Sequence, residues 1–221
     1  MNHSIIAIFF LTLLSCDNNN LNNTSSENLI APLIVQKETK VNRLPSFDIK
    51  SIFEWSPLVI FSHTSEGLTS EEKEDLINKN KSSAWELIEH TKNKMTLKSI
   101  SNDLVNLYYL ESVKNQIGVL ALAVNNRQNN SVEIWSIGEN RSFRKIKDPF
   151  QINANDFMSS EEKLPDDYQA TFQYHYVEPK SVEVSLHTWM EKAFEDRKIA
   201  NKVLFEWDGE IFKKKIIKLN S

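Results

Sequence analysis

The sequence predicts an α+β fold that is mainly antiparallel β-sheet, with about eight strands and two or three short helices. From about residue 106 onward, short segments of apolar residues, several of them alternating with polar ones, follow one another. Brief polar turns join most of them, which is typical of antiparallel pairing, because parallel strands need long crossovers. The 221 residues are 40% hydrophobic and 25% charged, as in an ordinary globular protein. A partly closed barrel or a sandwich would both satisfy this pattern.

Eight segments carry the strand pattern. The alternation is clearest where Phe172, Tyr174 and Tyr176 share one face of a segment. Asp208-Gly209 lies between two apolar segments and is the strongest hairpin signal of the chain. The predicted strands cover residues 107–113, 117–124, 132–137, 143–146, 169–177, 182–186, 203–207 and 210–217.

Helical signals are fewer and come mainly before the strands. Thr69 and Glu72 fit a capping box, so a helix is predicted over about residues 70–80. Its apolar face is thin, because only Leu76 and Ile77 within it, and Leu68 just before it, are large apolar residues.

Other segments have weaker patterns. The apolar run at 57–61 is compatible with a buried strand, while residues 84–100 fit helix and strand equally well. Short helical insertions are expected near 155–162 and 188–200.

The N-terminus carries an export pattern. Ile5 to Leu14 is a ten-residue apolar run broken only by Thr12. It is too short to cross a bilayer, which takes roughly 20 residues, and is typical of the apolar part of a secretory signal peptide. Leu13-Leu14-Ser15-Cys16 follows, and Cys16 is the single cysteine of the chain.

This N-terminus resembles that of a bacterial lipoprotein precursor, whose lipobox places Leu three residues before a cysteine and a small residue directly before it. The resemblance covers about 16 residues and implies cleavage between Ser15 and Cys16. It also implies a thioether-linked diacylglycerol on Cys16, with acyl chains such as palmitate. Two or more acyl chains hold a protein stably on a membrane, whereas one chain binds only marginally.

The resemblance and the composition together predict three parts. Residues 1–15 are a lipoprotein signal peptide, and 16–46 are the lipidated Cys16 with a disordered tether rich in Asn and Ser, polar and without periodicity. Residues 47–221 form a single β-rich globular domain. The expected location is the bacterial cell envelope, lipid-anchored to the inner or outer membrane, a choice that the sequence leaves open.

Histidines are the first candidates for metal binding, because His175 and His187 fall on neighbouring predicted strands. Pairing the apolar faces of these strands sets His175 opposite Glu183 and His187 opposite Thr171. The two histidines then lie about 13 Å apart along the ladder, at roughly 3.3 Å per residue. Zinc–nitrogen distances are about 2.1 Å, so one metal ion cannot bind both. His175, Glu183 and His187 remain candidates for a solvated polar surface, with His175 paired to Glu183.

No catalytic residue, metal site or cofactor is predicted. The four glycines lie too far apart for a nucleophile elbow, a phosphate-binding loop or a dinucleotide fingerprint. A triad assembled from distant positions stays open, because triads are defined by geometry. The single cysteine excludes an intrachain disulfide and a zinc site built on several cysteines.

The charge balance argues against a nucleic-acid partner. Lys and Arg number 26 against 30 Asp and Glu, for a net charge of -4, where a nucleic-acid binder would usually show a basic face. Lys213, Lys214, Lys215 and Lys218 lie at the end of the last predicted strand, where lysines commonly protect an exposed sheet edge from pairing. We therefore favour edge protection over a nucleic-acid or lipid patch.

The expected function is a non-enzymatic binding or structural module, anchored to the membrane through Cys16 and contacting an envelope protein or glycan. One alternative is an anchored hydrolase acting on envelope polymers. Another is an inhibitor or immunity lipoprotein, for which residues 125–130 are the best candidate for a protruding loop. A binding module should show an exposed apolar patch, whereas an enzyme should show a pocket with convergent titratable groups.

Overall fold

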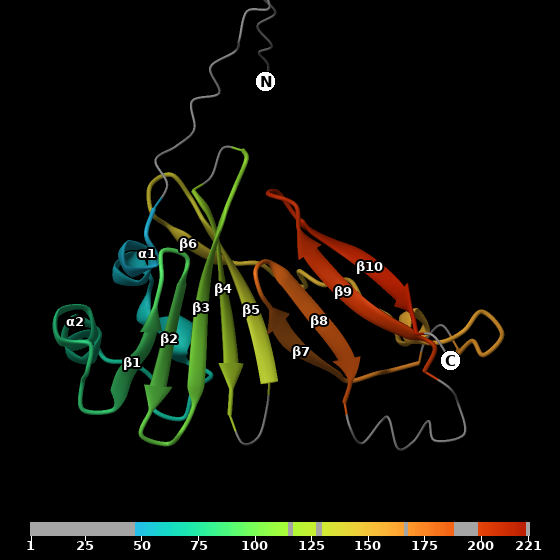
Figure 1. Ribbon diagram of the computed structural model, residues 1–221, viewed down its shortest axis with the longest axis horizontal. Coiled ribbons are helices and arrows are strands. Elements are labelled where there is room, and N and C mark those ends of the chain that lie inside the picture. The colour runs from blue at the N-terminus through green and yellow to red at the C-terminus, as the bar shows by residue number, and fades with distance from the viewer. Residues whose placement is uncertain (1–46, 115–116, 127–129, 166–167, 188–198, 220–221) are drawn as a thin grey trace, which may run out of the picture. The chain divides into compact units, whose positions relative to one another are not determined.

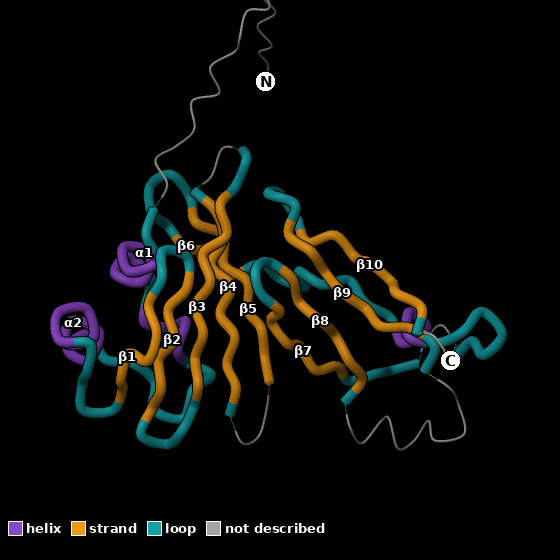
Figure 2. The backbone as a smooth tube through the Cα atoms, viewed as in Figure 1, coloured by secondary structure: helices purple, strands orange, loops and turns teal. Residues whose placement is uncertain are grey.

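The computed structural model describes residues 47–114, 117–126, 130–165, 168–187 and 199–219. All of these residues belong to one compact unit. In this described part, ten strands form two antiparallel sheets, with two α-helices and two short 3-10 helices (Figure 1, Figure 2). The predicted α+β fold, mainly antiparallel β-sheet, is confirmed.

The first sheet has six strands in chain order, each antiparallel to the next, because short turns connect consecutive strands. Its central strands, β3 and β4, pair along their whole length. The strands are β1 (Trp85–His90), β2 (Lys94–Ser99), β3 (Leu104–Glu111), β4 (Gly118–Asn125), β5 (Asn130–Ile137) and β6 (Phe143–Lys145).

The second sheet has four strands in the order β10-β9-β8-β7, again with neighbours in the chain as neighbours in the sheet. The predicted hairpin at Asp208-Gly209 joins its last two strands. The strands are β7 (Phe172–Val177), β8 (Ser181–Leu186), β9 (Asn201–Trp207) and β10 (Phe212–Lys218).

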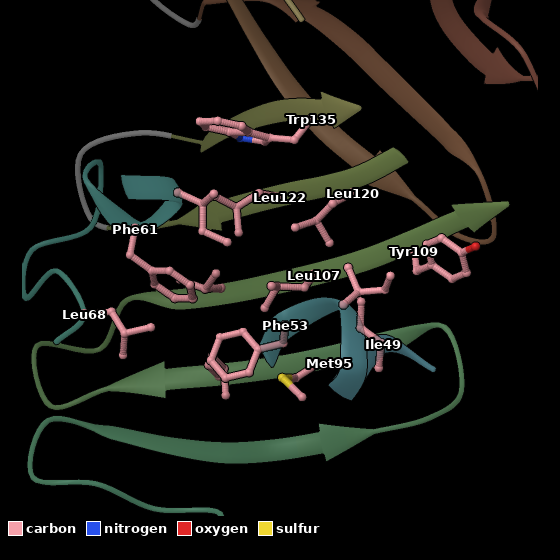
Figure 3. Close-up of a cluster of buried hydrophobic side chains, with 14 of the residues drawn as sticks. Ile49, Phe53, Phe61, Leu68, Met95, Leu107, Tyr109, Leu120, Leu122 and Trp135 are labelled. Atoms are coloured by element: carbon pink, nitrogen blue, oxygen red, sulfur yellow. The ribbon is translucent and has the colours of Figure 1, made fainter. Parts of the chain in front are cut away.

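Helices cover one face of the first sheet. They are α1 (Ile49–Trp55), the 3-10 helix η1 (Leu58–Phe61) and α2 (Ser70–Lys79). Figure 3 shows Phe53 and Phe61 directed at the sheet, where Leu107 and Leu122 belong to the same buried cluster. Alternation along each strand supplies these inward positions, because successive side chains point to opposite faces.

The ends of the two α-helices follow from local hydrogen bonds. The Asp48 side chain accepts from the Lys50 backbone N–H at 2.7 Å and begins α1. Thr69 and Glu72 form the predicted capping box at the start of α2, in which each side chain accepts from the other's backbone N–H. Only Leu76 of α2 is buried, as its thin apolar face predicts.

The second sheet packs against the opposite face of β3, β4 and β5. Tyr108, Val119 and Ile134 of the first sheet share a buried cluster with Val184 and Phe205 of the second. The 3-10 helix η2 (Ala154–Phe157) contributes to this cluster. Because both faces of β4 are covered, its sequence is apolar nearly throughout and shows no alternation.

The sequence suggested a strand at 57–61, but this segment contains the 3-10 helix η1 instead. Ile60 and Phe61 are adjacent and both buried in the same cluster, which a helical turn allows. In a strand, adjacent side chains would point to opposite faces. The predicted helix near 155–162 is the shorter η2, and most of the one near 188–200 lies outside the described residues.

Residues 84–100 contain two strands, β1 and β2, which raise the count from the expected eight to ten. Leu87 pairs with Leu97 and Glu89 with Thr96, so Ile88 is an extra residue in β1. This bulge interrupts the two-residue period by which a strand is recognised in a sequence. For that reason the sequence of residues 84–100 did not distinguish a helix from a strand.

Candidate binding cleft

Three turns from the two sheets line a cleft of about 480 Å³. Thr91 and Asn93 come from the turn between β1 and β2, and residues 178–180 form the turn between β7 and β8. Asp208 and Gly209 belong to the turn between β9 and β10, and residues 108–111 of β3 complete the wall. The cleft is thus built where the ends of two packed sheets meet.

Lys94 lines this cleft and contacts acidic side chains from both sheets. Its Nζ lies 2.8 Å from Glu89 Oε2 on the same sheet and 2.7 Å from Glu178 Oε1 on the β7–β8 turn. The ammonium also lies 5.9 Å from the centroid of the Tyr108 ring. Hydrogen bonds that the Lys94 ammonium donates to Glu178 and Glu89 raise the pKa of Lys94, so the side chain stays cationic across the physiological range.

Tyr108, whose ring lies beside the Lys94 ammonium, is stacked on Tyr176. The rings of Tyr108 and Tyr176 are stacked, with centroids 3.7 Å apart and planes inclined by 11°. The Tyr176 hydroxyl donates to the Pro179 carbonyl at 2.9 Å, which fixes the turn that carries Glu178. Burial raises the pKa of Tyr108 to about 12 and that of Tyr176 also well above its usual value. Both hydroxyls therefore keep their protons at neutral pH.

The end of β9 and the β9–β10 turn are attached to the end of β3 by hydrogen bonds, one from a side chain and one between backbone groups. The Trp207 indole N–H donates to the Glu111 carbonyl at 3.0 Å, and the Val113 N–H donates to the Gly209 carbonyl at 3.0 Å. Gly209 has φ +102, and a Cβ there would lie 2.9 Å from Val113 Cγ1. Glycine is therefore required for this close approach.

Asp208 is held by its own turn. Its carboxylate accepts from the backbone N–H groups of Glu210 and Ile211, each at 2.9 Å, and pairs with Lys213 at 2.8 Å. The backbone bond from Ile211, then Lys213 and the bond from Glu210, lower the pKa of Asp208 well below its usual range. The carboxylate is thus charged at the rim of the cleft.

Carboxylates outnumber ammonium groups around the cleft. Of the two lysines that line it, Lys94 is bound by Glu89 and Glu178, and Lys180 lies 3.3 Å from Glu206. Four acidic side chains line it, Glu89, Glu111, Glu178 and Asp208. The cleft therefore favours a ligand that offers hydrogen-bond donors or a positive charge.

The structure confirms the predicted register of β7 and β8. His175 lies opposite Glu183, and the His187 N–H donates to the Thr171 carbonyl at 2.9 Å. His175 and Glu183 are thus paired across the two strands as predicted, and Glu183 also forms an ion pair with Lys202, 2.6 Å away on β9. Within the described residues, no group of three or more His, Cys, Asp or Glu side chains is placed to hold a metal ion.

Other predicted positions lie outside the described residues. Ser15 and Cys16 are among them, as are residues 127–129 of the proposed protruding loop at 125–130. In the ranges that the structure describes, no helix is both long and apolar enough to span a membrane.

Sequence reasoning missed the residues that line the cleft. Lys94, Tyr108 and Glu178 are far apart in the chain and share no local spacing. The single available signal was the charged turn at 178–180, which was interpreted only as a break between two strands.

Comparisons with known proteins extend the description of the fold. No family model matches the chain, and no curated protein matches it. A solved structure of a domain of an uncharacterized protein from Porphyromonas gingivalis W83 is similar, with a TM-score of 0.53 at 11% sequence identity. The match covers 77% of this chain and 99% of that domain. At this identity the likeness shows a shared fold and nothing about a ligand.

Proposed function

We propose that the protein is a lipid-anchored protein of the bacterial cell envelope, whose β-rich domain binds a polar ligand in the cleft around Lys94. The lipobox-like sequence ending at Cys16 supports the anchor. The ion pairs of Lys94 with Glu89 and Glu178 carry the binding assignment, since they place fixed charges from two sheets on one cleft.

The protonation states in the cleft favour recognition over catalysis. General acid–base catalysis works best with groups whose pKa lies near the working pH. Burial and ion pairing move the pKa values of Tyr108, Tyr176 and Lys94 away from neutrality. These side chains are consequently suited to present constant charge and hydrogen-bonding patterns, which supports a binding module over the hydrolase alternative.

The class of ligand is indicated by which side-chain groups of the cleft are exposed. Tyr108 is covered by Tyr176 on one ring face, and Trp207 is 4% exposed, so neither offers a broad platform for a sugar ring. The carboxylates of Glu89 and Glu178, in contrast, have side chains 46% and 56% exposed. A ligand rich in amino or other donor groups, such as a polar peptide segment, fits this lining better than a glycan.

Titration with soluble envelope fragments from the native host, followed by two-dimensional NMR, tests the proposal. Ligand should shift the resonances of Lys94 and Tyr108 in the full-length protein. Glu178→Gln should weaken binding by about tenfold or more, because a hydrogen bond to a charged group contributes about 1.5 to 3 kcal/mol. Glu183→Gln makes the same change on the outer face of the same sheet and should leave binding unchanged.

Two results would contradict this function. If the ligand shifted only the resonances of residues remote from Lys94, the cleft would not be the binding site. Cleavage of the envelope fragments during the titration would favour the hydrolase.

A further inference from the structure

Strand β10 has an open edge, visible at the margin of the second sheet in Figure 1. It pairs with β9 along its whole length, and no strand of the described residues pairs with its other side. The Asp208 N–H donates to the Ile211 carbonyl and the Leu219 N–H to the Ala200 carbonyl. Along an antiparallel strand, the backbone N–H and C=O groups of successive residues point to opposite sides. Because Ile211 and Leu219 bond toward β9, the odd-numbered residues of β10 do so as well.

The even-numbered residues consequently direct their backbone groups away from the sheet. Lys214, Ile216 and Lys218 present N–H and C=O groups at the free edge, each available to an added strand. This is the arrangement to which an extended peptide can add as a further strand.

The three lysines in the first half of this edge, at 213–215, give it little protection against pairing with another strand. Lys213 pairs with Asp208 and Lys214 with Asp156, each at 2.8 Å, and Lys215 pairs with Glu206. Their ammonium groups are therefore engaged by acidic side chains of the same domain. The predicted edge position of these lysines is right, but their charges are largely neutralised.

The second half of the edge is apolar and exposed. Ile216 is 49% exposed, Ile217 is 44% exposed and Leu219, which follows, is 49% exposed. Ile216 lies opposite the buried Val203, so it continues the inner face of the sheet, whereas Ile217 lies on the outer face. A strand added here would cover apolar side chains on both faces.

We propose that the free edge of β10 binds an extended peptide segment of another protein, which joins the second sheet as a fifth strand. Its apolar residues would lie beside Ile216 and Ile217, and an acidic residue beside Lys218. Lys218 has no acidic partner among the described residues, so it supplies the charge complementarity. This surface is separate from the cleft and does not depend on the function proposed above.

A second copy of the chain fits this edge less well. Four of the seven residues of β10 are lysine. Antiparallel pairing of two such strands would place no acidic residue beside Lys218 of either copy, because β10 contains none, so this charge would stay uncompensated. An acidic and apolar strand supplies the missing negative charge.

Residue-resolved amide hydrogen exchange of the full-length chain in a mild detergent tests the proposal. The probe is an acetylated eight-residue peptide of valine and glutamate in which single glutamates alternate with pairs of valine, so that two adjacent valines can lie beside Ile216 and Ile217 and a glutamate beside Lys218. In the control peptide, lysine replaces each glutamate. At about 1 mM, the valine–glutamate peptide should slow exchange at Lys214, Ile216 and Lys218 by about tenfold or more. Lys213, Lys215 and Ile217 should be protected with or without peptide, because their N–H groups already bond to β9.

Three results would overturn the proposal. The valine–glutamate peptide could leave the even-numbered amides unprotected. These amides could already be protected in the dilute, peptide-free protein, which would mean that another part of the chain covers the edge. Protection that grows with protein concentration, without peptide, would identify a second copy as the occupant.

Two substitutions separate edge pairing from side-chain contact. Ile216→Pro removes an outward N–H without removing a bond to β9, so it should abolish binding, whereas Ile216→Val should retain it within about threefold. Lys218→Glu is the second test if the proline variant does not fold. It should weaken binding of the valine–glutamate peptide and strengthen binding of the valine–lysine peptide, and an unchanged preference would contradict the assignment.

Discussion

Lys94 of β2 and Glu178 of the β7–β8 turn approach within 2.7 Å between Nζ and Oε1, although they belong to different sheets. The apolar cluster between the sheets stabilises their packing without specifying direction, because burial of apolar surface is non-directional. The ion pair adds a directional contact at the edge of that cluster. Glu89 holds the same ammonium from the first sheet, so Lys94 acts as a positioning residue for both carboxylates.

Replacing Lys94 by methionine should lower the free energy of unfolding by about 1 to 2 kcal/mol, since it removes two partly exposed ion pairs that contribute up to about 1 kcal/mol each. The substitution keeps most of the side-chain stem, so the loss reports the charge contacts. Lys98→Met on the same strand is the control, because Lys98 is exposed, and it should stay within about 0.5 kcal/mol of the wild type. Urea unfolding measures the stability of both variants. Equal losses of stability would contradict the role of Lys94 in positioning the two carboxylates.

Gly118 should tolerate no side chain. A Cβ at this position would lie 2.3 Å from the Leu110 carbonyl oxygen and 2.7 Å from Tyr109 Cε2. Because one of these atoms is backbone, Gly118→Ala should destabilise the domain by about 3 kcal/mol, the upper end for overpacking.

Gly67→Ala is the matched control for this substitution. Gly67 has φ +67 but open space around it, so alanine there should cost only about 1 kcal/mol of conformational strain. Thermal unfolding of the two variants should rank them in this order, and the reverse ranking would contradict the close approach at Gly118.

The two buried clusters should unfold together. Phe53 lies in the cluster under the helices and Phe205 in the cluster between the sheets, and the first sheet contributes to both. Truncating either one to alanine should cost about 3 to 5 kcal/mol, in a single transition, while Val59→Ala at an exposed position should change little. Two separate transitions, seen by circular dichroism and by tryptophan fluorescence, would show that the sheets are independent units.

Stability should fall at alkaline pH. Burial raises the pKa of Tyr108 and of Tyr109 from 10.0 to about 12, and it also raises that of Tyr176. Above pH 10 the unfolded chain releases phenol protons that the folded chain retains, so each further rise favours unfolding. Below pH 10 both states keep these protons, and the tyrosines contribute no pH dependence.

Tyrosinate absorbance recorded with near-ultraviolet circular dichroism checks this expectation. The absorbance due to the buried tyrosines should appear together with the loss of tertiary structure, between about pH 10 and 12. Ionisation of all tyrosines with a midpoint near pH 10 in a protein that stays folded would contradict their burial.

The sequence predicted strands best where turn chemistry and alternation agree. Asp208-Gly209 marked the β9–β10 hairpin, and the facing apolar positions set His175 opposite Glu183. A slip of one residue would have turned a whole apolar set toward solvent, so a half-buried strand specifies its register strongly.

The remaining elements depend on contacts that no local pattern contains. Ile88 interrupts the alternation of β1 as a bulge, and the run at 57–61 becomes a 3-10 helix because α1 and the sheet bury both Ile60 and Phe61. The cleft was unpredictable for the same reason. Lys94 meets Glu178 only because two sheets pack together, and this packing follows from the whole domain.

The anchor at Cys16 is the central claim of this account, since it determines where any ligand must be sought. The direct measurement is the intact mass of the protein extracted by detergent from its native membranes, compared with that of a Cys16→Ser variant. The account predicts a mature chain that begins at Cys16 and carries the mass of acyl chains, which the variant lacks. An unmodified chain, cut elsewhere or not at all, would contradict the anchor and with it the envelope assignment.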